Sequence, residues 1–340
     1  MWQIQNTTGY KCAGTFQRDA EGHEYWCAAI RATFEVEDDG RLRHAAGQIE
    51  VNLAPRLAGQ QNEILLADDD VIPFAPVTDI LIRGRAQPAA ATSAPAALSV
   101  EIGTLRKQAI LYPPRRARLS GGSWRLLDIS AQEPASLGWE HSFGGTLPGE
   151  PGDQPPENPL GTGIGLRAPR LFDEGAEIDL PRIEGMGMDC AQDPQASRSI
   201  GFGPVPRWWR DRVMLAGRFD ADWRQNRSPA MPVDYDPRFL CSAPRDQWPC
   251  GHMVGGEAVH LRGFTADRDW RFRLPQAVFR LETRFGLRVV PMPAHLARVD
   301  LWPSDNLVSM LWLGALACNG RDEQIGTTRL SLRQLSGVSA

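Results

Sequence analysis

Residues 201–248 read GFGPVPRWWRDRVMLAGRFDADWRQNRSPAMPVDYDPRFLCSAPRDQW, and the rest of the chain is expected to be arranged around this stretch. It carries four of the eleven tryptophans, and arginines and aspartates alternate with its aromatic residues. Prolines recur after Pro206, and proline removes a backbone donor and restricts the residue before it. We therefore predict no regular amphipathic helix here, but an irregular segment held in place by the remainder of the fold.

Large rings with polar edges and guanidinium groups that stack on them suit either an internal scaffold or a face that binds another protein. For any single residue, core packing with satisfied ion pairs is the more common situation. We predict that the exposed members of one set contact a partner: Trp208, Trp209, Arg210, Trp223, Arg224, Arg245 and Trp248.

A second set is expected to fix loops rather than to bind. Asp234 and Asp236 are expected to pair with Arg224, Arg227 or Arg238, and Asp246-Gln247 to act similarly at the end of the stretch. Glycines at 161, 163 and 165 resemble a phosphate-binding loop, but no strand precedes them and no Lys-Ser/Thr follows. The predicted loop-organising residues are Asn158, Gly161, Asp220, Asp234, Asp236, Asp246 and Gln247.

Alternating apolar and polar residues predict strands at both ends of the chain. Residues 25–36 have the period of a half-buried strand, and Asp39-Gly40 supplies a tight turn into a partner strand from Arg41 onward. Further strands are expected at 78–86, 98–111 with a bend at Gly103, 257–264, 270–274, 276–284 and 287–291, and in a hairpin of 296–302 with 307–317. The pattern of 323–340 fits either a short helix or a last strand.

These elements predict a mainly β protein with antiparallel sheets in two sandwich-like halves. The expected divisions are a β-rich amino-terminal half at 1–112, a Pro/Gly/Trp-rich irregular central region at 113–250, and a β-rich carboxy-terminal half at 251–340. One continuous structural unit is the alternative at this length.

Composition argues against several classes of partner. The 340 residues carry a net charge of −4, which gives no long-range attraction to nucleic acid or to an anionic membrane. No apolar run has the length of a membrane span, and the start has no signal-peptide pattern, so a cytoplasmic location is expected. Of the 37 basic residues, only Lys11 and Lys107 are lysines.

The sequence predicts neither a metal site nor a cofactor. The six cysteines show no C-x-x-C pair, and His252 and His260 near Cys241 and Cys250 fit no ligand spacing. Asp68-Asp69-Asp70 is expected to be a solvated acidic turn.

We also predict no catalytic residue, because no G-x-S-x-G or H-E-x-x-H motif is present. A hydrolase that uses paired carboxylates is kept as an alternative, with candidates Asp220, Asp222, Asp234, Asp236, Asp246, Glu257, His141 and His252.

The order of several motifs is informative. The central stretch contains GFGP, WxxR, AGxxDxxW, MPxDxDPRF and APxDQ, and ordered matches outside it include Val77-Thr78-Asp79-Ile80, Trp139-Glu140, Phe143-Gly144-Gly145, Asn158-Pro159-Leu160-Gly161 and Gly255-Gly256-Glu257. This order resembles a family of bacterial proteins encoded beside type VI secretion spike genes. The chain departs from the family pattern at Arg218, at Leu240-Cys241-Ser242 and at Arg245.

The resemblance implies a non-catalytic adaptor or chaperone that stabilises a type VI effector and promotes its loading onto the VgrG–PAAR spike. The implied partners are the effector, the PAAR protein, or both, with VgrG as a further contact. The alternative that the resemblance leaves open is a structural component that is secreted with the spike.

Overall fold

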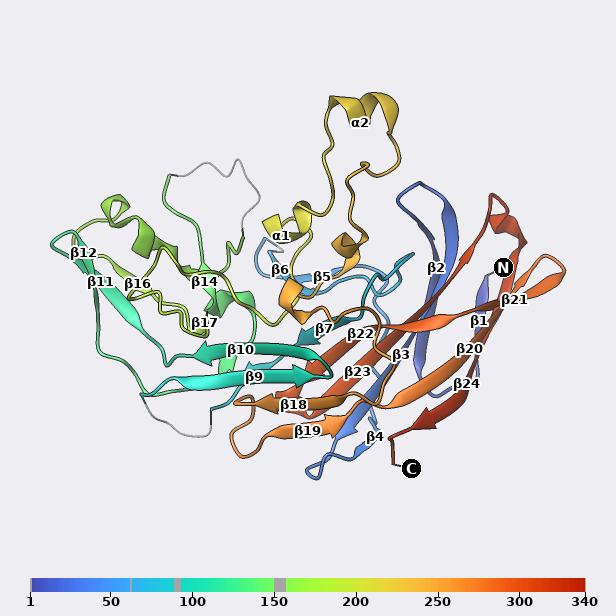
Figure 1. The fold of residues 1–340 in the computed structure, drawn as a ribbon, viewed down its shortest axis with the longest axis horizontal. Coiled ribbons are helices and arrows are strands. Elements are labelled where there is room, and N and C mark those ends of the chain that lie inside the picture. The colour runs from blue at the N-terminus through green and yellow to red at the C-terminus, as the bar shows by residue number, and fades with distance from the viewer. Residues whose placement is uncertain (1, 62, 89–92, 150–156, 340) are drawn as a thin grey trace.

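The computed structural model describes residues 2–61, 63–88, 93–149 and 157–339, and strands dominate them (Figure 1). The predicted mainly β class is confirmed. Part of the proline- and glycine-rich loop expected before Asn158, residues 150–156, lies outside the described residues.

A six-stranded sheet lies at the centre, with the order β2-β3-β23-β22-β7 and β4 paired to β3. Its members are β2 (Lys11–Arg18), β3 (Glu24–Val36), β4 (Leu42–His44), β7 (Asp79–Ile82), β22 (Ala294–Trp302) and β23 (Leu307–Ala317). The turn predicted at Asp39-Gly40 is confirmed, because Gly40 has φ +82° and β4 returns along β3. The predicted hairpin of β22 with β23 is also confirmed.

The expectation that residues 25–36 form a half-buried strand is wrong. Residues 26–34 of β3 are buried on both faces of the sheet, including Arg31 and Thr33. Trp26, Ile30 and Phe34 face the main core, whereas Cys27 and Ala29 pack under Val71 and Ile72. Alternation identified the two faces of the strand correctly, but a distant part of the chain covers the face that was expected to be solvated.

Two further sheets pack on the other side of the main core. The five-stranded sheet has the order β17-β10-β9-β18-β19, and the four-stranded sheet has the order β1-β24-β20-β21. Their strands are β1 (Gln3–Asn6), β9 (Ala96–Ile102), β10 (Leu105–Leu111), β17 (Ile183–Gly185), β18 (Ala258–Arg262), β19 (Trp270–Arg273), β20 (Gln276–Phe285), β21 (Arg288–Met292) and β24 (Ile325–Ser336). Thus the carboxy-terminal segment, left open between helix and strand, is strand β24.

The strand order unites the two ends of the chain. β3 pairs with β23, β9 with β18, and β1 with β24, so each large sheet combines strands from 1–112 with strands from 251–340. The layers of the structure therefore do not correspond to the amino-terminal and carboxy-terminal thirds of the sequence. These two thirds contribute to one shared hydrophobic core. The apolar faces of the two ends bury each other rather than closing separately.

Short elements occupy the central region, where periodicity is weak. They include β11 (Arg116–Ser120), β12 (Ser123–Leu126), β13 (Ala135–Ser136), β14 (Phe143–Gly144), β15 (Thr162–Gly163) and β16 (Glu177–Asp179). The short strands β5 (Arg56–Ala58), β6 (Ile64–Ala67) and β8 (Arg85–Ala86) lie before this region. Strands of two to five residues are too short to show alternation, which explains why those in the central region were not predicted.

The stretch Gly201–Trp248 contains two short α-helices, α1 (Arg210–Val213) and α2 (Ala221–Asn226). It also contains 3₁₀ turns η4 (Pro237–Leu240) and η5 (Arg245–Gln247). The prediction of an irregular segment holds for most of the stretch but missed α2, whose N-cap is Asp220. Within the described ranges, no helix combines the length and the apolar character needed to cross a membrane.

Candidate protein-binding site

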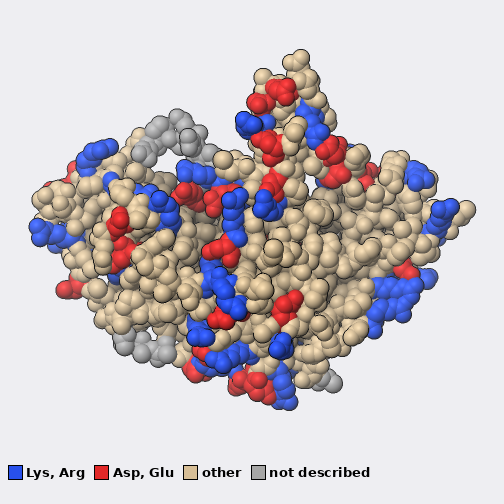
Figure 2. Space-filling model, in the orientation of Figure 1, with Lys and Arg blue, Asp and Glu red and all other residues tan. Residues whose placement is uncertain are grey.

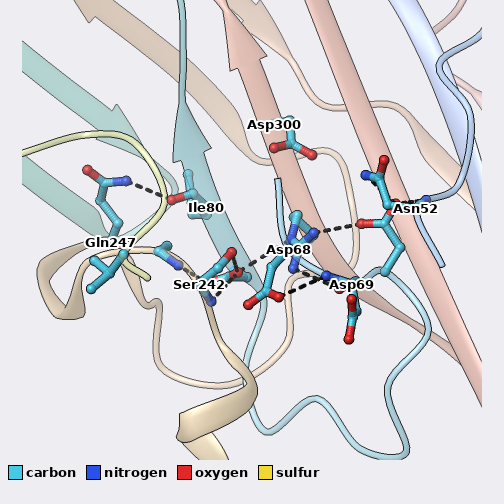
Figure 3. A network of polar contacts seen from close by, with 12 residues as sticks. Asn52, Asp68, Asp69, Ile80, Ser242, Gln247 and Asp300 are labelled. Carbon is cyan, nitrogen blue, oxygen red and sulfur yellow. Dashed lines mark hydrogen bonds and ion pairs between the residues drawn. The ribbon is translucent and has the colours of Figure 1, made fainter. Parts of the chain in front are cut away.

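The central stretch rests on a cluster of ionised side chains, which we call the polar network (Figure 3). It fills the second face of the six-stranded sheet, and its aspartates and arginines are equal in number. The members are Asp68, Asp69, Asp70, Asp79, Asp300, Arg31, Arg83, Arg207, Arg212 and Arg298. The expectation that Asp68-Asp69-Asp70 is a solvated turn is wrong, because Asp68 and Asp70 are each 1% exposed.

Short ion pairs join the network across the sheet. Arg298 Nη1 lies 2.7 Å from Asp70 Oδ1, and Arg31 Nη2 lies 2.7 Å from Asp300 Oδ2. From the central stretch, Arg212 Nη1 approaches Asp68 Oδ2 at 2.7 Å. Equal numbers of opposite charges within hydrogen-bonding distance offset the cost of burying each charge.

Burial and ion pairing compete in setting the pKa values of the network carboxyls. Burial alone raises the pKa of Asp68, but Arg212 and Arg207 outweigh it, so this pKa lies below its ordinary value. Asp300 behaves in the same way beside Arg83 and Arg31. For Asp70, burial prevails over Arg298 and Arg31, and the pKa is raised.

Asp79 and Gln247 tie the end of the central stretch to β7. Asp79 accepts hydrogen bonds from the backbone N–H groups of Ser242 and Ala243, both at 2.8 Å. Gln247 Nε2 donates to the carbonyl oxygen of Ile80 at 2.7 Å (Figure 3) and to that of Phe202 at 3.0 Å. The VTDI, GFGP and APxDQ motifs, which are far apart in sequence, therefore meet at one place.

Lys107 fixes the same junction from β10. Its ammonium group is buried and donates to Gly201 O at 2.5 Å, Asp246 Oδ1 at 2.8 Å and Gln247 Oε1 at 2.9 Å. The group also lies over the Phe202 ring, 4.7 Å from its centroid. All three ammonium protons thus have acceptors, so the predicted organising role of Asp246 and Gln247 depends on a lysine that sequence reasoning did not single out.

A second group of motifs meets around Trp139. Its Nε1 donates to the carbonyls of Gly203 and Pro204, and Trp209 packs edge-on against its ring at a centroid distance of 5.4 Å. Asn158 Nδ2 donates to Trp139 O at 2.9 Å. A Cβ at Gly161 would lie 2.5 Å from both Asn158 Nδ2 and Ser142 O, so only glycine fits this approach.

Above this base, residues 216–235 form a projection that we call the arm (Figure 1, top). Its neck is closed by Asp236 N donating to Leu215 O at 2.9 Å, and by Asp234, which accepts from Arg218 N at 3.0 Å and Arg218 Nε at 3.1 Å. The prediction that Asp234 pairs with Arg224, Arg227 or Arg238 is therefore wrong. Gly217, at φ +80°, turns the chain so that Arg218 faces Asp234 instead.

The other predicted carboxylates of the arm and its neck, Asp220 and Asp236, act locally. Asp220 accepts from Trp223 N at 2.9 Å and caps α2. Asp236 caps η4 and pairs with Arg238, one of its expected partners. The side chain of Trp223 packs on Phe219, and its Nε1 donates to Ala230 O at 2.8 Å. These contacts give the small arm a defined internal structure.

Between the arm and the β2–β3 hairpin lies a cavity of about 730 Å³, which we call the groove. Arg227 pairs with Glu21 at 2.5 Å, and Met231 N donates to Ala20 O at 2.7 Å, so the arm rests on the hairpin beside it. Apolar and aromatic side chains line most of the groove, among them Tyr25, Ile72, Phe74, Met231, Tyr235, Phe239 and Leu240. Phe74 is 51% exposed, although it is a large apolar residue.

The predicted partner-binding residues have different positions. Trp209 is fully buried, so the expectation that it contacts a partner is wrong; it packs on Trp139 inside the molecule. Trp208 is 41% exposed, Trp248 is partly buried under Arg238, and Arg210 pairs with Glu157 at 3.1 Å. Arg224 and Arg245 are exposed, and Trp223 is partly buried within the arm. None of the seven lines the groove.

The candidates of the hydrolase alternative are dispersed. Asp220, Asp222 and Asp234 lie on or at the neck of the arm, and Asp246 is paired with Lys107. Glu257 accepts from Val254 N, while His252 Nε2 donates to Ala75 O. His141 lies in a separate cavity beside Arg182 and Glu133. No pair of these groups shares the aromatic groove.

One carboxylate and thiol cluster could be considered for a metal: Glu184, Asp189 and Cys190. Arg115 already pairs with both carboxylates, with 3.0 Å between its Nη1 and Asp189 Oδ1. Burial raises the pKa of Cys190 and of Glu184, which disfavours the charged forms that bind metals. The guanidinium takes the position that a cation would require.

Sequence reasoning missed the groove residues. Met231, Tyr235 and Phe239 lie within the MPxDxDPRF motif, so the motif itself was the available signal. Tyr25 and Phe74 come from the first 75 residues, and no spacing rule connects them to that motif.

Comparison with known proteins gives a family. The searches of curated proteins and of solved structures each found no match. Residues 21–313 match the family model described as "Uncharacterized protein conserved in bacteria (DUF2169)", which covers most of the chain, and this protein therefore belongs to that family.

Proposed function

We propose that this protein is a non-catalytic adaptor that holds a type VI effector, or its PAAR tip, for loading onto the VgrG spike. The motif order supports the type VI assignment, since it resembles proteins encoded beside spike genes. The observation that carries a binding role is the groove, whose volume and aromatic lining suit an apolar side chain or extended segment of another protein.

The packing below the groove supports binding rather than turnover. The polar network and the Lys107 junction hold the stretch 201–248 in one conformation, so the groove is formed before the partner arrives. A preformed apolar site loses little conformational entropy on binding. Phe74 comes from a different segment than Met231 and Tyr235, and the fixed base sets the spacing between the two segments.

The test is the affinity of the purified protein for the effector or PAAR protein encoded beside its gene, measured by calorimetry. Phe74→Ala is expected to weaken binding about 30-fold, the effect of losing an interface residue worth about 2 kcal/mol. Phe219→Ala is the matched control, because Phe219 is 48% exposed on the arm but does not line the groove.

Unchanged affinity in a folded Phe74→Ala protein would show that the groove is not the binding site. A purified chain that turns over a substrate, and loses the activity when one candidate carboxylate is changed, would replace the adaptor role with the hydrolase alternative. Recovery of the protein with the toxin in the secreted fraction would favour the spike-component alternative.

A further inference from the structure

A second surface, distant from the groove in sequence and sheet, has a distinct charge. The solvent face of the sheet β1-β24-β20-β21 carries Arg280 and Arg284 on β20 and Arg329 on β24. Glu282 and Arg329 occupy paired positions, which places them on the same face, and Val289 of the edge strand β21 lies on this face opposite Arg284. We call this surface the basic face.

The arginines of the basic face differ from those of the polar network. Arg280 pairs with Glu282, but Arg284 and Arg329 have no carboxylate in ion-pair distance among the residues that the structure describes. Both are exposed. In the network, by contrast, every arginine has an aspartate within 4 Å.

The local charge is opposite to that of the whole chain. Three arginines against one glutamate give the basic face a net charge of +2, whereas the whole chain carries −4, so the rest of the chain carries −6. Figure 2 shows basic residues as a blue area at the position where Figure 1 draws β20 and β24. The basic face therefore attracts an acidic surface, and this attraction favours one orientation of the partner.

From this charge pattern we propose that the basic face docks an acidic surface of another protein. Exposed Val278 and Val289, at 53% and 65%, provide apolar contacts beside the guanidinium groups. Gln3 and Gln5 on β1 add amide donors and acceptors next to Arg329. A mixture of apolar side chains and arginines is typical of a protein interface.

A nucleic acid fits this face less well. A duplex longer than the sheet would run onto the acidic remainder of the surface, and its affinity depends on many phosphate contacts. Single strands are held by stacking on exposed rings, whereas the solvent-facing residues of this sheet are aliphatic, polar or charged. The charge and the side chains together favour an acidic protein.

The experiment measures binding of the full chain to poly-L-glutamate by biolayer interferometry at low and at physiological salt. We expect binding at low salt that weakens as salt rises, and a loss of at least tenfold in the Arg284→Glu/Arg329→Glu variant. The matched control is Arg125→Glu/Arg170→Glu, which makes the same charge change at exposed arginines of the central region and is expected to alter binding less than twofold.

Three results would overturn the proposal: no binding at low salt, an equal loss in both double variants, or tighter binding to a 20-base-pair duplex or to phosphatidylserine vesicles than to poly-L-glutamate. Phe74→Ala is expected to leave poly-L-glutamate binding unchanged. Failure of the basic face is therefore distinguishable from failure of the groove, because each has its own variant and its own ligand.

Discussion

The polar network and the arm are parts of one structure that differ in almost every physical property. In the network, Arg212 and Asp68 are each about 2% exposed or less and their charges are paired inside the protein. On the arm, Phe219 and Val233 are 48% and 86% exposed, and Arg218 pairs with Asp234 in solvent. Buried ion pairs therefore fix the base of the central stretch, whereas the arm exposes apolar side chains to solvent.

The largest loss of folding stability is expected from a substitution inside the polar network. Asp300→Ala removes the carboxylate that joins Arg31 to Arg83, which leaves Arg31 with Asp70 alone and Arg83 without its aspartate. Removing one partner of a buried ion pair costs about 3–5 kcal/mol. Chemical denaturation should show a loss of this size in the free energy of unfolding.

The arm offers the control for that substitution. Asp222 is exposed on α2, and its contact is a hydrogen bond from Asn226 at 2.7 Å. Asp222→Ala is expected to change the free energy of unfolding by no more than about 0.5 kcal/mol. Equal losses in the two variants would remove the distinction between a structural base and a dispensable projection.

Trp208 and Trp209 are neighbours in the sequence and allow an exposed and a buried tryptophan to be compared directly. Trp209 is fully buried against Trp139, whereas Trp208 is 41% exposed. Trp209→Ala is expected to cost about 3 kcal/mol, the lower end for a buried tryptophan, because its Nε1 has no hydrogen-bond partner among the described residues to lose. Trp208→Ala is expected to cost less than about 1 kcal/mol, and similar losses by thermal unfolding would contradict this assignment.

Lys107 shows how much of the structure can be predicted from the sequence. In β10 it has the same phase as Leu105, Ala109 and Leu111, all of which are buried, so the alternation itself marked this lysine as an inward residue. Its acceptors at 201, 246 and 247 were not predictable from that pattern, because they lie about 95 to 140 residues further along the chain.

Arg31 shows what the alternation pattern cannot predict. A period of two reports on which face of a sheet a side chain lies, not on what covers that face. The cover over Arg31 consists of Asp70, from a turn that appeared solvated, and Asp300, from the carboxy-terminal half. The strands and turns were therefore predictable locally, whereas the polar network and the groove depend on contacts between distant segments.

The next prediction concerns the pH dependence of stability and involves His295, which lies beside His252. The rings of His252 and His295 have centroids 4.3 Å apart, and burial, followed by the nearby His252, lowers the pKa of His295 to about 4. In the unfolded chain a histidine takes up its proton near pH 6.5. The unfolded state therefore binds more protons between pH 6.5 and 4, so stability is present above this window and falls by about 2–3 kcal/mol through it.

His295→Gln is expected to flatten this part of the stability curve, measured by denaturation at pH 7, 5.5 and 4.5. His23→Gln is the control, because the side chain of His23 is 73% exposed in the β2–β3 turn. If the wild type and His295→Gln lose the same stability between pH 7 and 4.5, His295 does not hold its neutral form in the folded protein.

The smallest expected effect is a local loss of stability in α2 that leaves the stability of the core unchanged. Asp220 caps α2 by accepting from Trp223 N, and loss of such a cap costs about 1 kcal/mol of helix stability. Because the arm is joined to the body through its neck and the contacts of Arg227 and Met231, Asp220→Ala is expected to open α2 without weakening the core. Hydrogen exchange should then quicken about fivefold at residues 223–227, while β3 and β23 exchange as before. A matching increase in β3 would mean that the arm and the six-stranded sheet unfold as one unit, and that the arm cannot be altered independently of its base.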